Sequence, residues 1–65
     1  MEFMWYDYMG NFHFSNYELI TIKNGKERRS FHDLNEEEVQ KVINDYIAEG
    51  AKEVTNNDHI ITARF

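Results

Sequence analysis

Residues 33–51 read DLNEEEVQKVINDYIAEGA, and this stretch carries the signals of one amphipathic helix. Asn35 is a favoured N-cap residue, and Glu38 three positions later completes a capping box. Five apolar residues recur at the spacing of a single helical stripe: Val39, Val42, Ile43, Tyr46 and Ile47. Gly50 fits the left-handed position that commonly follows a helix. The sequence therefore predicts a helix from about Glu36 to Glu49.

Strand-forming segments lie on both sides of this helix. Residues 16–23 read NYELITIK, and the Asn24-Gly25 pair after them is a strong β-hairpin signal because both turn positions favour positive φ. Residues 26–31, KERRSF, supply the return strand. After the helix, KEVT and HIITARF flank residues 56–58, which predicts a second hairpin turning there or one long kinked strand. We expect a small α+β domain, with an antiparallel sheet of three to five strands in the order β-β-α-β and the helix on one face.

The N-terminus is rich in aromatic residues. Seven of the ten lie in the first seventeen positions: Phe3, Trp5, Tyr6, Tyr8, Phe12, Phe14 and Tyr17. We expect residues 1–10 to form an arm or a strand, followed by a turn at Gly10-Asn11 and a strand interrupted near Ser15-Asn16. One helix covers only one face of a sheet that is apolar on both, so an exposed apolar surface for another chain is expected, first of all for a second copy. The alternative is that the aromatic residues fill a single core.

Size and charge restrict the protein class. A chain of 65 residues is expected to form one domain, 1–65, and the absence of cysteine fits a reducing cytoplasm. We expect no signal peptide, because the start has no basic segment. We expect no membrane-spanning segment and no membrane partner, because no apolar run approaches the ~18 residues of a membrane span. A net charge of -5 argues against free nucleic acid as the main partner, since phosphate contacts need clustered basic side chains.

The sequence contains no recognisable motif for catalysis or metal binding. None of the three histidines has the helical spacing or the short cluster of a metal site: His13, His32 and His59. No serine lies in a nucleophile motif, and no glycine-rich phosphate loop is found. We therefore predict a protein that is not an enzyme and that uses no cofactor or metal. Lys26, Arg28 and Arg29 are interpreted as charges that protect a solvated edge strand.

Four carboxylates gather at the predicted helix start and are called the acidic group: Asp33, Glu36, Glu37 and Glu38. Helix capping and the positive end of the helix dipole account for negative charge at this place. A functional interpretation is phosphate mimicry, because carboxylates on a rigid element can occupy the positions where an enzyme binds DNA phosphates. Both interpretations stay open at this point.

The hairpin SNYELITIKNGKERRSF (15–31), the helix start LNEEEV (34–39) and the strand HIITARF (59–65) together resemble the short uracil-DNA glycosylase inhibitors of small tailed Bacillus phages. The resemblance runs from about Asn11 to Phe65. Members of that family form homodimers that mimic DNA, and they enclose in an apolar pocket the residue that the glycosylase inserts into DNA. The resemblance implies a phage-encoded homodimeric inhibitor of a host DNA-acting enzyme, working in the host cytoplasm.

The family pattern has aromatic residues early in the helix, whereas residues 36–41 here have none. The N-terminal segment 1–9 is an addition to the family pattern, so a pocket has to be lined differently here. Our hypothesis is that Trp5, Tyr6, Tyr8 and Phe12 line it, and that they bind the partner together with the acidic group. Other functions remain open. The chain can be an interaction or assembly subunit, an antagonist of another defence system such as an anti-CRISPR, or a single-strand binder that stacks bases on its aromatic strands.

Overall fold

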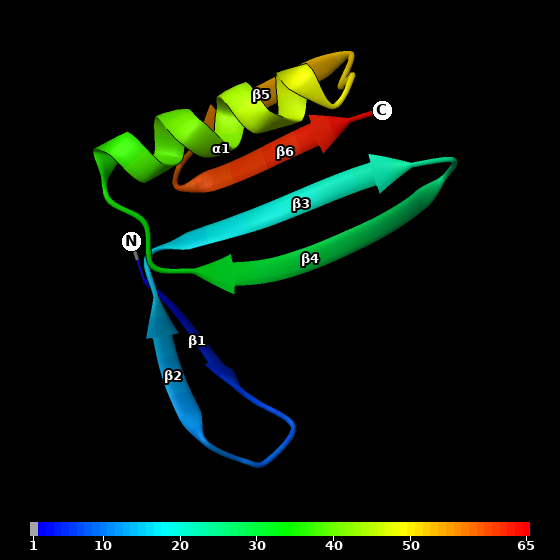
Figure 1. The fold of residues 1–65 in the computed structure, drawn as a ribbon. Coiled ribbons are helices and arrows are strands. Elements are labelled where there is room, and N and C mark those ends of the chain that lie inside the picture. Colours follow the sequence, from blue (N-terminus) through cyan, green and yellow to red (C-terminus); the bar gives the residue numbers. More distant parts are fainter. Residues whose placement is uncertain (1) are drawn as a thin grey trace.

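A computed structural model of the chain describes residues 2–65, which form one helix and six strands in two sheets (Figure 1). The elements are β1 (Phe3–Tyr6), β2 (Phe12–Ser15), β3 (Tyr17–Lys23), β4 (Lys26–His32), α1 (Glu36–Ala48), β5 (Glu53–Asn57) and β6 (Ile60–Arg64). The predicted α+β class is confirmed. The predicted β-β-α-β order corresponds to β3, β4, α1 and the region after the helix. It is matched only in part, because that region forms two strands and because β1 and β2 come before β3. Met1 of the predicted N-terminal arm lies outside the described residues.

The larger sheet has the strand order β4-β3-β6-β5, and its two central strands run parallel. Leu19 of β3 lies opposite Ile61 of β6, and the outer pairs are antiparallel. The prediction of an antiparallel sheet is therefore wrong at the centre. Parallel neighbours need a long crossover, and β4, α1 and β5 together supply it here. Strands β1 and β2 form a separate antiparallel pair that extends away from the larger sheet (Figure 1).

Helix α1 begins as predicted and ends one residue earlier. The Asn35 side chain accepts from the Glu38 N–H at 2.9 Å, and the Glu38 carboxylate accepts from the Asn35 N–H at 3.0 Å, which completes the capping box. Glu49 is the C-cap residue. Gly50 follows at a φ of 99° and donates its N–H to the Ile47 carbonyl at 3.1 Å, which satisfies one of the free carbonyls at the helix end.

Two turns of left-handed residues close the hairpins of the larger sheet. Asn24 and Gly25 have φ values of 53° and 75°, as the sequence predicts. The second hairpin is also present, but its turn lies at Asp58-His59, with φ values of 51° and 63°, instead of at residues 56–58. Asn56 and Asn57 belong to β5 and pair with β6. Asp and His are among the residues that adopt positive φ most readily, which suits them to the two turn positions.

The core lies between α1 and one face of the larger sheet. Leu19, Val39 and Ile61 are buried at its centre. Partly buried residues surround them: Tyr17, Leu34, Val42, Ile43, Tyr46 and Val54. Of the seven N-terminal aromatic residues only Tyr17 packs against this core, so the single-core alternative is wrong. The helix lies over β5 and β6 (Figure 1), which leaves the helix-side face of β4 uncovered.

Asn16, between β2 and β3, joins three distant segments. Its side-chain amide donates to the Leu34 carbonyl at 2.8 Å and accepts from the Leu34 N–H at 2.8 Å. Its carbonyl lies 2.8 Å from Nδ1 of His59, and the His59 ring stacks on Tyr17 with centroids 4.5 Å apart. The predicted interruption near Ser15-Asn16 is confirmed, and it connects the helix start and the β5–β6 turn to the first strand of the sheet.

Replacing Asn16 with alanine is expected to destabilise the protein by about 2 kcal/mol, because two part-buried backbone groups of Leu34 lose their partners. Urea unfolding monitored by circular dichroism measures the change. Asn44→Ala is the matched control, since it removes one exposed hydrogen bond to Gln40 and is expected to change stability by less than about 0.5 kcal/mol. Equal effects of the two substitutions would contradict the connecting role of Asn16.

Candidate functional site

The β1–β2 hairpin presents one apolar face to solvent. In its antiparallel register Met4 pairs with Phe14 and Tyr6 pairs with Phe12, and residues that pair directly share a face. These four side chains, called the aromatic hairpin face, are between 46% and 70% exposed. The Tyr6 and Phe12 ring centroids lie 5.1 Å apart, and those of Phe12 and Phe14 lie 4.8 Å apart. A contiguous exposed apolar surface of this kind marks an interaction site.

The opposite face of the hairpin is the one that attaches it to the larger sheet. Trp5 stacks on His13 at a centroid distance of 4.4 Å, and its Nε1–H donates to the buried Ser15 hydroxyl at 2.8 Å. The Phe31 ring of β4 lies 6.0 Å from Trp5 and 5.7 Å from Phe3. Phe31 pairs with Glu18, next to the core residue Leu19, so the hairpin packs on the sheet face opposite the helix.

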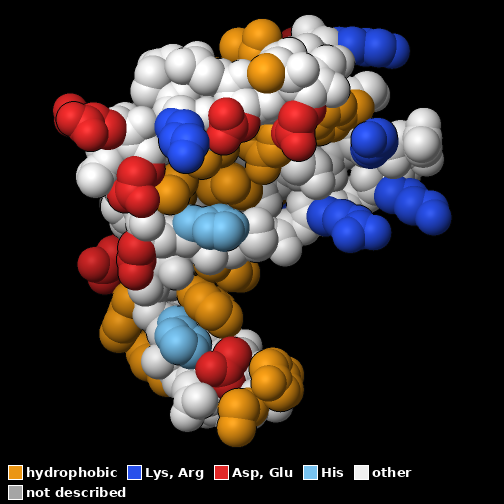
Figure 2. Space-filling view, viewed as in Figure 1, with side chains coloured by type: hydrophobic (Ala, Val, Ile, Leu, Met, Phe, Trp, Pro, Cys, Tyr) orange, Lys and Arg blue, Asp and Glu red, His pale blue; other side chains and the backbone are white. Residues whose placement is uncertain are grey.

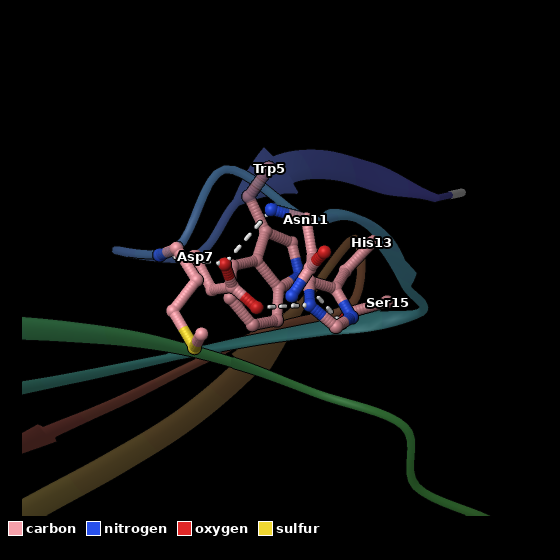
Figure 3. Close-up of polar contacts among 6 residues, drawn as sticks. Trp5, Asp7, Asn11, His13 and Ser15 are labelled. Atoms are coloured by element: carbon pink, nitrogen blue, oxygen red, sulfur yellow. Dashed lines mark hydrogen bonds and ion pairs between the residues drawn. The ribbon is translucent and has the colours of Figure 1, made fainter.

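Asp7 organises the loop between the two strands (Figure 3). Its carboxylate accepts from the backbone N–H groups of Met9 and Asn11, each at 2.9 Å, and lies 2.9 Å from Nε2 of His13. These contacts, with His13 first, lower the pKa of Asp7 from 3.8 to about 2. Gly10, at a φ of 84°, completes the loop. Asp7 is not among the residues singled out from the sequence, although an aspartate three residues before a glycine is a turn signal.

The loop itself extends the apolar surface at the tip of the hairpin. Tyr8 is 98% exposed there, and Met9 is 72% exposed. Of the predicted pocket residues, the structure brings Tyr6 and Phe12 together, puts Trp5 on the opposite hairpin face and leaves Tyr8 at the tip. Alternation along a strand separates Trp5 from Tyr6, so the four residues do not line one common surface.

The acidic group lies at the start of α1 and is exposed. Glu38 has a local role, since its carboxylate completes the capping box. Within residues 2–65, no basic side chain approaches Asp33, Glu36 or Glu37 within 4.0 Å. Acidic side chains gather at the end of the molecule where α1 begins, and basic ones gather at the other end (Figure 2). The hydrogen bonds between Asn16 and Leu34 put the acidic group at the same end as the root of the hairpin.

Comparisons with protein families, curated proteins and solved structures give no match to this chain. In the part of the chain that the structure describes, no group of three or more His, Cys, Asp or Glu side chains is arranged to hold a metal ion. No helix within residues 2–65 has the length and apolarity that a membrane crossing requires. The candidate site therefore rests on the geometry of the hairpin and of the acidic group.

The Asp7 loop is expected to keep its structure as the pH falls from 7 to about 4 and to lose the hydrogen bonds of the Asp7 carboxylate only as the pH falls through its folded pKa of about 2. A carboxylate whose pKa is lowered by folding stabilises the folded state above its unfolded pKa, and this contribution disappears as the pH approaches the folded pKa. Carbon-detected NMR of the Asp7 carboxyl group measures the midpoint. A midpoint near 3.8 would contradict the pairing with His13.

Proposed function

We propose that this protein is a non-enzymatic, homodimeric inhibitor that binds a host DNA-acting enzyme. The observation that carries the proposal is the aromatic hairpin face, because an apolar surface on a hairpin that stands apart from the core has no structural role within its own chain. A two-stranded hairpin is at most marginally stable alone, and a partner on this face stabilises it.

The aromatic hairpin face joins two copies. Large side chains carry 150–250 Å² of surface each, so its four members at their exposed fractions present about 500 Å². Two copies bury about 1,000 Å² together, which reaches the lower bound of a specific interface. Pairing of identical faces about a twofold axis closes the assembly at two, the commonest oligomeric state.

The enzyme contacts the tip of the hairpin and the acidic group. Tyr8 is the apolar anchor, since large amphipathic rings concentrate binding energy at interfaces. Asp33, Glu36 and Glu37 occupy the positions of DNA phosphates, and Glu38 remains in the helix cap. The resemblance to phage inhibitors makes uracil-DNA glycosylase the specific target, and the net charge of -5 suits a basic DNA-binding groove. The site of action is then the host cytoplasm.

The purified protein is expected to inhibit a bacterial uracil-DNA glycosylase stoichiometrically in a uracil-excision assay. Because charge mimicry is screened by salt, the affinity is expected to fall at least tenfold between about 0.05 and 0.3 M salt. Absence of inhibition at large excess would overturn this target. The chain would then be an assembly subunit or an antagonist of another defence system. The inhibition assay would be repeated with a panel of other host DNA-acting enzymes.

Two variants separate dimerisation from target binding. Tyr6→Ser with Phe12→Ser is expected to convert the dimer to a monomer in sedimentation experiments and to weaken inhibition. Tyr8→Ser is expected to leave the dimer intact and to weaken inhibition at least tenfold. Ile47→Ser is the matched control, since Ile47 is 58% exposed on α1 away from both surfaces. A wild-type protein that sediments as a monomer at 0.1 mM would contradict the dimer.

A further inference from the structure

A groove of about 530 Å³ opens at the other end of the larger sheet, between the end of α1 and the β3–β4 turn. The side chains that give it chemical character are three cations, two aromatic rings and one carboxylate: Lys23, Lys26, Arg28, Tyr46, Phe65 and Glu49. Figure 2 shows basic side chains gathered at this end of the molecule. No residue of the β1–β2 hairpin or of the acidic group lines the groove, so its ligand is independent of the proposed inhibition.

The cationic wall of the groove is not neutralised within the chain. The β3–β4 register puts Lys23 directly opposite Lys26, and Arg28 follows on the same face. Like charges directly opposite each other destabilise a hairpin. Within residues 2–65 no carboxylate lies within 4.0 Å of these three side chains. A bound anion would remove this repulsion, and a phosphate accepts hydrogen bonds from arginine and lysine especially well.

Lys26, Arg28 and Arg29 lie exposed on an edge strand, as the sequence predicts, but Arg29 does not belong to this wall. Its side chain lies on the opposite face of the sheet, where it is 3.4 Å from Glu27 and 3.9 Å from Glu18. Lys23, which the sequence analysis did not include, takes its place. Strand alternation thus separates a neutralised arginine from three cations that face the groove.

The second wall carries two aromatic rings. The Tyr46 and Phe65 rings meet edge to face at 6.3 Å, and the Lys23 ammonium lies 5.4 Å from the Phe65 centroid. The Phe65 N–H donates to the Ile22 carbonyl at 2.9 Å, which holds this ring beside β3. A planar heterocycle can stack on such rings. Glu49 lies at the same wall, and its carboxylate accepts hydrogen bonds but donates none.

We propose that this groove binds a nucleoside monophosphate whose base carries an exocyclic amino group. Lys23, Lys26 and Arg28 hold the phosphate, and Tyr46 and Phe65 contact the base. The amino group donates to Glu49, as amino groups of bases do to carboxylates in nucleic-acid recognition. The volume lies in the range of about 300–1,000 Å³ that is usual for small-molecule sites.

NMR titration of the full chain with AMP, CMP, UMP and inorganic phosphate tests the proposal. AMP and CMP are expected to shift the Tyr46 and Phe65 resonances saturably, and to bind at least fivefold more tightly than UMP or inorganic phosphate. Arg28→Gln is expected to weaken AMP binding at least tenfold. Glu49→Gln is expected to weaken AMP and CMP binding without weakening UMP binding. Lys41→Gln, an exposed lysine outside the groove, is the matched control for the loss of one positive charge.

Each opposing result overturns a defined part of the proposal. If no saturable shift occurs with 10 mM AMP, the groove is not a nucleotide site. If inorganic phosphate binds as tightly as AMP, the aromatic wall does not contact a base. If UMP binds as tightly as CMP, Glu49 does not read an amino group. If Arg28→Gln and Lys41→Gln have equal effects, binding depends on net charge alone. The spectra of the variants show directly whether each remains folded.

Discussion

The two hydrogen bonds between the Asn16 side chain and the Leu34 backbone are the constraint on which the arrangement depends. An asparagine amide offers one donor and one acceptor side by side, as a strand backbone does, so it pairs with Leu34 in the place of another strand. Asn16 also separates β2 from β3, and its backbone carbonyl contacts Nδ1 of the His59 ring. The direction of the hairpin, the start of the helix and the last turn are therefore fixed at one point.

Features that depend on neighbouring residues could be predicted from the sequence. The cap at Asn35, the end at Gly50 and the turn at Asn24-Gly25 are determined by contacts within a few positions, and all three are present. The parallel pairing of β3 with β6 could not be predicted, since strands of this composition pair in either direction. The contacts of the His59 ring with Tyr17 and Asn16 could not be predicted either, because these residues are distant from His59 in the sequence.

The candidate surfaces were predictable in kind and only partly in detail. Aromatic content indicates an exposed apolar surface, and alternation along a strand separates Trp5 from Tyr6, whereas the pairing of Tyr6 with Phe12 needs the register of β1 with β2. Alternation likewise puts Arg28 and Arg29, which are adjacent in sequence, on opposite faces of the sheet. Glu38 was identified correctly as a capping residue from its spacing to Asn35. The alternation of side chains along each strand thus determines which of these residues share a surface.

The parallel centre of the larger sheet has a consequence for folding kinetics. The hairpins β1–β2, β3–β4 and β5–β6 and the helix close over short stretches of chain, and such elements form within microseconds. The pairing of Leu19 with Ile61 joins the two halves of the chain and bears the largest loop-closure entropy, so it forms late. Until then β3 and β6 each have an unpaired edge. At high protein concentration β6 of one molecule can pair with β3 of another, which makes the centre of this sheet the place where strand exchange between copies begins.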